Sequence, residues 1–251
     1  MSSIAAIILT KNEEEMLPDC LESVKFCDEI IVVDDGSDDD TLKIAKRYKA
    51  KIVEAKGGFS KKRNQGAKKA GSEWLFYIDA DERATPLLRK EIEGVIKKDG
   101  FTAYAIPRKN ILLGREMKHG GWWPDYVLRL IKKDALKEWQ GKLHEQPKIK
   151  GETKKLKNPL THISHRNLSD MVEKTNDWSD IEAELLYKVD HPKMTWWRFL
   201  SAGFREFWYR GIKKVGFLDG IPGVIEVLYQ SFSKMITYAK LWEMQLERKE
   251  K

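Results

Sequence analysis

The sequence contains little cysteine, which excludes a protein held together by disulfides. Its 251 residues include two cysteines, Cys20 and Cys27, which lie close together and form no framework. We expect both to be buried, reduced thiols of a cytosolic protein.

Long hydrophobic runs are also absent. No apolar stretch reaches the roughly 18 residues that a membrane-spanning helix needs. The chain starts Met1-Ser2-Ser3 and leads straight into an apolar segment with no secretory signal pattern. Charged residues make up 34% of the chain and the mean hydropathy is −0.55, so we expect a soluble, cytoplasmic protein. The length allows one large domain, or one domain with an appendage.

Acidic residues are outnumbered by basic ones, 39 against 46, which gives a net charge of +7. This surplus favours an anionic partner: nucleic acid, a nucleotide or an anionic lipid surface. The glycine-rich phosphate motifs Gly-x-Gly-x-x-Gly and the Walker loop are both missing. A nucleotide would therefore not be held in the dinucleotide or P-loop manner.

Two apolar segments that end in acids dominate what is present. Residues 74–78 are apolar, aromatic or branched, which predicts a strand buried on both faces. Asp79, Asp81 and Glu82 follow it, and a second apolar run at 30–33 ends in Asp34 and Asp35. Parallel strands end at one edge of a sheet, so these carboxylates should converge.

Such a cluster predicts a metal–diphosphate site. Mg²⁺ and Mn²⁺ prefer oxygen ligands and share them with substrate phosphates. The basic stretch Lys61-Lys62-Arg63 lies nearby in the chain and could meet those phosphates. An alternative stays open at this point: Asp79 and Asp81 could simply cap a helix expected at 86–98.

Strand and helix patterns alternate through the first hundred residues. Strands are expected at 4–9, 30–33, 51–55 and 74–78, with helices from about 12 to 23, at 42–48 and from about 61 to 70. This alternation favours an α/β fold with a mostly parallel, doubly wound sheet flanked by helices.

Four motifs in order resemble the inverting family-2 glycosyltransferases of the GT-A fold: Thr10-Lys11-Asn12-Glu13, Val33-Asp34-Asp35-Gly36-Ser37, Arg63-Asn64 with Gly66 and Ala67, and Asp79-Ala80-Asp81. The resemblance implies a nucleotide-sugar donor, a Mg²⁺ or Mn²⁺ ion and direct displacement at the anomeric carbon. It implies that Asp81 holds the metal on the diphosphate. It also implies a donor pocket formed by Thr10, Asn12, Glu13, Asp34, Asp35, Lys62, Arg63, Asp79 and Ala80, with Asp35 accepting from a uracil N–H.

The middle of the chain holds candidate acceptor groups. Trp122 and Trp123 follow two glycines, and their rings could stack on the C–H faces of a sugar or, alternatively, fill the core. Inverting transfer needs a base that takes the acceptor hydroxyl proton, usually a carboxylate. The Leu143-His144-Glu145 segment resembles the subgroup that includes lipopolysaccharide core β-1,4-glucosyltransferases. That resemblance implies Glu145 as base, with Asp125 as the second choice and His144 beside the acceptor. His162 and His165 are expected at the surface or facing the diphosphate.

From residue 167 the pattern becomes helical. We therefore expect a catalytic domain at 1–166, with a nucleotide-sugar half at 1–100 and an acceptor half at 101–166, and a helical region at 167–251. Aromatic and basic residues alternate in 193–214, and 223–246 is amphipathic. Residues 193–246 thus fit an anionic membrane surface. The alternatives are that these helices pack on each other, on the catalytic domain or in a homodimer.

The resemblance implies a hexosyltransferase, with glucose from UDP-glucose as the best guess for the donor. The subgroup resemblance implies a lipid-linked glycan acceptor, such as lipopolysaccharide core, and a peripheral location on the inner face of the cell membrane. One rival is a nucleotidyltransferase acting on sugar phosphates, but its glycine-rich, lysine-bearing loop is missing. The other is a nucleic-acid-binding protein that stacks bases on Trp122, Trp196 and Trp208. The acidic strand ends oppose it, so we expect no nucleic-acid partner.

Overall fold

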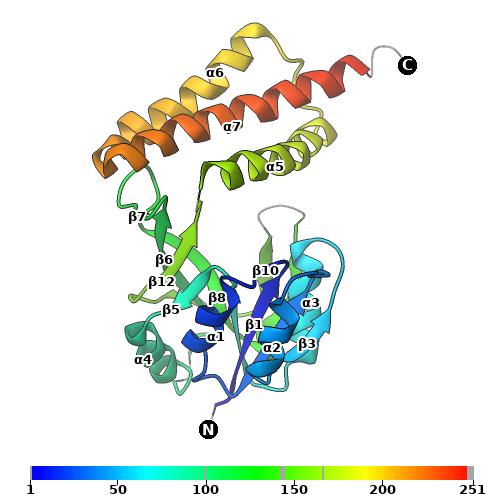
Figure 1. Cartoon of the computed structure of the whole chain (residues 1–251), viewed down its shortest axis with the longest axis vertical. Helices are drawn as coiled ribbons and strands as arrows, with labels where there is room; N and C mark the ends of the chain where they lie inside the picture. The colour runs from blue at the N-terminus through cyan, green and yellow to red at the C-terminus, as the bar shows by residue number, and fades with distance from the viewer. Residues whose placement is uncertain (1, 99, 142–144, 166, 248–251) are drawn as a thin grey trace. The chain divides into compact units, whose positions relative to one another are not determined.

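The structure is a computed structural model that describes residues 2–98, 100–141, 145–165 and 167–247 (Figure 1). The chain divides into two compact units. The first, which we call the sheet unit, comprises residues 1–109 and 125–162. The second, the helical unit, comprises residues 110–124 and 163–251.

These units do not follow the functional division expected from the sequence. The segment 110–124, which we expected in the acceptor half, belongs to the helical unit. Along the chain, the last boundary between the units falls after residue 162, whereas the sequence predicted it after residue 166. The reason is that 110–124 forms backbone and side-chain bonds with the later helices: Gly120 N donates to Lys214 O at 2.8 Å. The functional boundary at 166 stays a prediction.

Four parallel strands form the first part of the sheet: β1 (Ile4–Thr10), β2 (Glu29–Asp34), β3 (Lys51–Glu54) and β4 (Trp74–Asp79), in the order β3-β2-β1-β4. The sheet then continues through β8 (Asp125–Lys132), β6 (Ala103–Leu112), β12 (Leu160–Ser164) and β5 (Glu82–Ala84). β8 pairs antiparallel with both β4 and β6, so the sheet is mixed. The predicted α/β class is confirmed.

Shorter strands complete the sheet unit and its edges. β9 (Leu136–Gln140) follows the 3-10 turn η1 (Lys133–Ala135) and pairs antiparallel with β10 (Gln146–Ile149). β11 (Thr153–Lys155) pairs parallel with β6, and β7 (Arg115–Glu116) pairs with the end of β6.

In the described part of the sheet unit, the α-helices are α1 (Leu17–Ser23), α2 (Thr41–Arg47), α3 (Phe59–Lys69) and α4 (Pro86–Val95). The expected helix from residue 12 is wrong in its first turn. The backbone amides of Asn12, Glu13 and Glu14 donate instead to Ser37, Thr41 and Asp39 side chains. This binding to the next loop prevents a helix from starting before Leu17.

The helix-cap alternative for Asp79 and Asp81 is also wrong. α4 begins after Thr85, whose hydroxyl oxygen accepts a hydrogen bond from Leu88 N at 3.2 Å. The short strand β5 separates the two aspartates from that helix. Their carboxylates are therefore not needed for capping.

The core lies on both faces of the sheet. Along β1, Ala6 and Ile8 pack into one cluster, and Ala5 and Ile7 into the other. This is the alternation that a pleated strand imposes when it is buried on both sides. On the second face, α3 comes so close to β1 that a Cβ on Gly66 would lie 2.5 Å from Ile7 Cγ2.

The helical unit contains α5 (Leu168–Lys188), α6 (Trp196–Phe207) and α7 (Gly220–Glu247). A π-helical turn η2 (Trp208–Lys213) and a 3-10 turn η3 (Gly216–Asp219) connect α6 to α7. Asn167 caps α5 by accepting from Asp170 N at 2.8 Å. None of the helices in the described ranges is long and apolar enough to cross a membrane.

Candidate active site at the ends of the parallel strands

The acidic strand ends lie at one edge of the sheet, as predicted. In the register of the sheet, Thr10 of β1 pairs with Asp34 of β2, and Leu9 pairs with Asp79 of β4. β1 lies between β2 and β4, so the two acidic loops start on either side of its last residues. The sheet topology alone thus brings together motifs that are 45 positions apart in the chain.

Asp34 lies beneath its own loop and shapes it. The side chain is buried at 1% exposure. One oxygen accepts from Thr10 Oγ1 at 3.0 Å and from Ser37 Oγ, and the other accepts from Gly36 N and Ser37 N at 2.9 Å each. Gly36 adopts φ +81°, a conformation that favours glycine. Thr10 and Asp34 therefore support the donor pocket that the sequence predicts instead of forming its surface.

Asp35, the next residue, is half-buried, with its side chain 21% exposed. Lys62 Nζ of α3 lies 3.0 Å from Asp35 Oδ2 and 4.7 Å from the centre of the Phe59 ring. On the other side of the loop, Asn12 Oδ1 accepts from Asp38 N at 3.0 Å, and Glu13 N donates to Thr41 Oγ1 at 2.8 Å. All six predicted donor-pocket residues from Thr10 to Lys62 thus lie in the 34–41 loop or bond to it.

Arg63 joins the β4 end to the segment that carries Glu145. Its Nη2 lies 2.9 Å from Asp79 Oδ1, and its Nε lies 3.0 Å from Glu145 Oε1. The guanidinium also packs over the Trp139 ring, 5.0 Å from its centre. The Arg63 side chain is 3% exposed, whereas those of Asp79 and Glu145 are 30% and 16% exposed. Arg63 therefore pairs with both the predicted donor-side carboxylate, Asp79, and the predicted base, Glu145.

Arg129 of β8 is a site residue that sequence reasoning missed. Its Nη2 contacts Asp79 Oδ2 and lies 2.9 Å from Glu82 Oε1. Burial alone would raise the pKa of the Asp79 carboxyl, but the Arg129 and Arg63 guanidiniums outweigh burial and hold this pKa well below its usual range. The available signal was an arginine inside an apolar strand, because arginine is almost never fully buried unless it is paired.

Asp81 lies beside a histidine. His162 Nε2 of β12 is 3.5 Å from Asp81 Oδ2, and the two side chains are 14% and 26% exposed. Burial disfavours the charged imidazole, but its hydrogen bond to Asp81 prevails and raises the pKa of His162. Ala80, between the two aspartates, is buried, and its carbonyl accepts from Arg83 Nη1 at 2.7 Å.

This donor set fits a metal that is shared with a phosphate. Mg²⁺ and Mn²⁺ are commonly held by one or two carboxylates together with substrate oxygens and not by an all-protein cage. Within the described part of the chain, no group of three His, Cys, Asp or Glu side chains could hold a metal ion. Asp81 would therefore be the protein's carboxylate ligand, and His162 lies close enough to orient it or to join it.

The predicted acceptor residues fall in different parts of the chain. Asp125 lies in the sheet unit, where Arg108 Nη2 is 2.6 Å from its Oδ2. Trp122 and Trp123 belong to the helical unit. Trp122 packs there against His165 and under Arg210, whereas Trp123 is 44% exposed. His144 lies outside the described residues.

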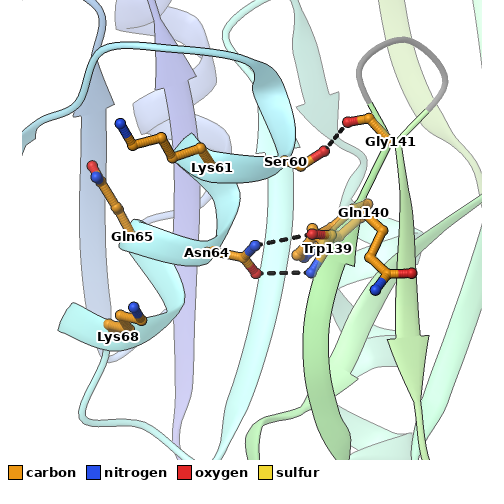
Figure 2. Close-up of a pocket in the computed structure, with 8 residues that line it drawn as sticks. All are labelled: Ser60, Lys61, Asn64, Gln65, Lys68, Trp139, Gln140 and Gly141. Carbon is orange, nitrogen blue, oxygen red and sulfur yellow. Dashed lines mark hydrogen bonds between the residues drawn. The ribbon is translucent and has the colours of Figure 1, made fainter.

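A pocket of about 620 Å³ lies between α3 and β9 (Figure 2). The Asn64 side chain fastens one wall to the other: its Nδ2 donates to Trp139 O at 3.0 Å and its Oδ1 accepts from Trp139 N at 2.8 Å. Among the described residues, the lining carries amide, hydroxyl and ammonium groups and no carboxylate: Ser60, Lys61, Asn64, Gln65, Lys68, Trp139, Gln140 and Gly141. Asn64 of the third motif therefore holds β9, and Arg63 beside it binds the carboxylates.

The family model described as Glycosyl transferase family 2 matches residues 5–153, more than half of the chain. The chain belongs to this family. That membership confirms the resemblance drawn from the four motifs, and the parallel strands with their acidic ends agree with the predicted GT-A arrangement.

The family-2 chain also has relatives over nearly its whole length. An uncharacterized glycosyltransferase of Rickettsia typhi is 28% identical over 98% of this chain and 89% of its own. The lipopolysaccharide core biosynthesis glycosyltransferase LpsC of Rhizobium meliloti is 26% identical over 96% of this chain and 92% of its own. Among solved structures, S. aureus TarS 1–349 is 16% identical, with a TM-score of 0.49 over 98% of this chain and 91% of that one.

Proposed function

We propose that this family-2 glycosyltransferase transfers a hexose, with glucose from UDP-glucose as the best guess, to a lipid-linked glycan of the lipopolysaccharide core type. The observation that carries the proposal is Arg63, which lies within 3.0 Å of both Asp79 at the donor side and Glu145 at the predicted acceptor side. The similarity to LpsC supports the acceptor class. The reaction takes place at the cytoplasmic face of the membrane, with the enzyme bound peripherally.

In the proposed reaction, Glu145 takes the proton of the acceptor hydroxyl as its oxygen attacks the anomeric carbon. The bond from that carbon to the diphosphate breaks on the opposite face, which inverts the configuration. Asp35 binds the nucleobase and Asp79 faces the ribose or the sugar. A divalent ion held by Asp81, when bound, neutralises negative charge on the departing nucleoside diphosphate. Asp125 is the alternative base, and its ion pair with Arg108 leaves it 25% exposed.

The donor is tested by a thermal-shift panel of UDP- and GDP-sugars with Mg²⁺, with Mn²⁺ and with EDTA. A ligand at about one hundred times its Kd adds about 2.7 kcal/mol to stability. We expect a shift that is specific for UDP-sugars and depends on metal. A shift with nucleoside triphosphates instead would support the nucleotidyltransferase, and no shift with any sugar nucleotide would refute the proposal.

The base is tested by Glu145→Gln, which keeps the shape of the side chain but cannot accept the proton. We expect a single-turnover rate lower by about 10²- to 10⁴-fold, with unchanged UDP-sugar binding. Asp125→Asn is the comparison. If that variant loses the rate and Glu145→Gln keeps it, the base is Asp125.

A further inference from the structure

The most prominent feature outside the catalytic site is an apolar face on the helical unit. On α6, Trp197 and Phe204 are 65% and 61% exposed, and Trp208 at the start of η2 is 53% exposed. On α7, Leu228 and Phe232 are 53% and 52% exposed. Scattered exposed apolar residues are ordinary, but a contiguous set of large ones marks an interaction surface. We call this set, with Trp196, Leu200 and Val224, the aromatic face.

The two helices run antiparallel. Met194 N, just before α6, donates to Gln245 near the end of α7 at 2.8 Å. In the middle of α6, a Cβ on Gly203 would lie 2.7 Å from Met235, and after α6 a Cβ on Gly211 would lie 3.2 Å from Val227. Figure 1 shows α6 lying beside the longer helix α7.

This antiparallel packing puts both sets of exposed residues on one side. Each residue advances about 100° around an α-helix. Phe204 follows the contact residue Gly203, and Leu228 follows the contact residue Val227, so both turn away from the contact in the same sense. When two helices run antiparallel, the residue that follows a contact residue points to the same side of the helix pair in both helices. The aromatic face is therefore one surface built by two helices.

The third helix leaves this surface open. α5 packs on a different side of α7, where the Tyr229 hydroxyl donates to Met171 O at 2.6 Å. Thr237 Oγ1 and Lys240 Nζ of α7 also bond to residues of α5, at 3.1 and 2.7 Å. At about 100° per residue, Thr237 lies roughly opposite Leu228 and Phe232, whereas Tyr229 and Lys240 lie about 60° to 120° around the helix from them.

Positive charge borders the aromatic face. Residues 193–214 carry six basic residues and one acid, Glu206, a surplus of five. Arg198 and Arg205 follow Trp197 and Phe204 by one residue each, so they lie along the outer edge of the α6 stripe. Lys193, Lys213 and Lys214 are also exposed. On α7, Glu226 is buried, and the exposed acids Glu243 and Glu247 lie in its last turns.

We propose that the aromatic face is the surface by which the protein binds an anionic lipid bilayer, with its rings at the headgroup level and its cations on lipid phosphates. Amphipathic helices with aromatic and basic residues bind in this interfacial manner. A second copy of the chain is disfavoured as the occupant, because a two-fold contact would bring the basic surplus against itself. This inference rests on the proposed function in one respect: the lipid-linked acceptor is assumed to lie in the membrane that the aromatic face binds.

Vesicle flotation with the full-length protein tests this proposal. The probes are phosphatidylcholine vesicles and vesicles that also contain about 30% phosphatidylglycerol. We expect binding to the anionic vesicles, weakened by salt because screening shortens the reach of exposed charges. The double variant Trp197→Ser/Phe204→Ser should bind at least about tenfold more weakly, and Arg198→Gln/Arg205→Gln about 25-fold more weakly, since each cation contributes about fivefold.

The matched control is Trp178→Ser, which removes a 45% exposed tryptophan from α5 and should leave vesicle binding unchanged. Quenching of tryptophan fluorescence by brominated lipids gives a second readout in the unmodified protein. Absent vesicle binding, binding unchanged in both double variants, or a dimer that the double variants convert to monomer would overturn the proposal. The UDP-sugar thermal shift is measured on the same samples, so failure of the donor assignment is seen separately from failure of docking.

Discussion

Arg63 shows how single side chains set the geometry of this site. Its buried guanidinium contacts Asp79 and Glu145 at 2.9 and 3.0 Å, and Arg129 contacts the other oxygen of Asp79. Two cations on one carboxylate keep Asp79 ionised and fixed in position. Asp81, two residues on, lies beside His162, whose Nε2 is 3.5 Å from Asp81 Oδ2. The two aspartates of one short motif therefore have different chemistry.

Asp81→Asn should abolish most transfer while the protein stays folded. The side chain is 26% exposed, and its loss removes the carboxylate proposed to hold the metal. We expect the rate with UDP-glucose to fall by about 10²- to 10³-fold, with an unchanged circular dichroism spectrum. Asp38→Asn, an exposed acid on the neighbouring loop, is the control. Near-normal turnover in Asp81→Asn would remove the metal role.

Asp79 makes stability depend on pH in a defined direction. Its pKa in the folded protein is depressed by Arg129 and Arg63, against the effect of burial. A depressed pKa contributes stability that is fully present above the unfolded value of about 3.9 and is lost as the pH falls towards the folded value. Urea unfolding at pH 7 should therefore show Asp79→Asn to be less stable than the wild type, and this difference should shrink below about pH 4. A difference that stays constant down to pH 2 would contradict this account.

At the scale of elements, the approach of α3 to β1 and β2 decides where the basic residues of α3 lie. Gly66 allows it, since a Cβ there would lie 2.5 Å from Ile7 and 3.0 Å from Val33. Lys62 and Arg63, one turn earlier on α3, then reach Asp35 and Asp79. Gly66 of the third motif thus positions Lys62 and Arg63 by letting α3 pack closely on the sheet.

Gly66→Ala should destabilise the protein by about 1–3 kcal/mol, because the added methyl group overpacks a tight core. The control is Gly94→Ala in α4, where a Cβ would meet nothing within 4 Å. That change should stabilise by about 0.5–1 kcal/mol, since alanine favours a helix over glycine. Urea unfolding measures both. Equal effects of the two substitutions would show that α3 adjusts and that the close approach is not required.

At the scale of the whole molecule, acidic and basic side chains gather in different places. The net charge is +7, yet carboxylates gather at the strand ends and cations border the aromatic face. A nucleic-acid-binding protein needs a positive surface along which phosphates can lie. We therefore expect single-stranded oligonucleotides to bind only weakly, with the binding abolished near 150 mM salt, as measured by fluorescence anisotropy with UDP-glucose binding as the positive control. Tight binding at that salt concentration would favour the nucleic-acid alternative.

Much of the site could be predicted because its residues follow apolar strands in short motifs. Asp34, Asp35, Asp79 and Asp81 were identified from the ends of two buried runs, and the helices from 167 onwards from their periodicity. Arg129 was given no role, and His162 was expected only at the surface or facing the diphosphate, because their contacts with Asp79 and Asp81 come from strands far along the chain. The early start of α1 was wrong because side chains of the 34–41 loop bind the amides of 12–14.

The sequence by itself determined the family, the α/β class and the acidic ends of β2 and β4, because buried strands and their terminal residues are local patterns. Only the tertiary structure decided which carboxylates are available to a ligand. Asp34 is enclosed by its loop, Asp79 is held by two arginines and Asp81 faces His162. Such partners come from strands and helices far apart in the chain, and their meeting depends on strand order and register, which no local pattern encodes.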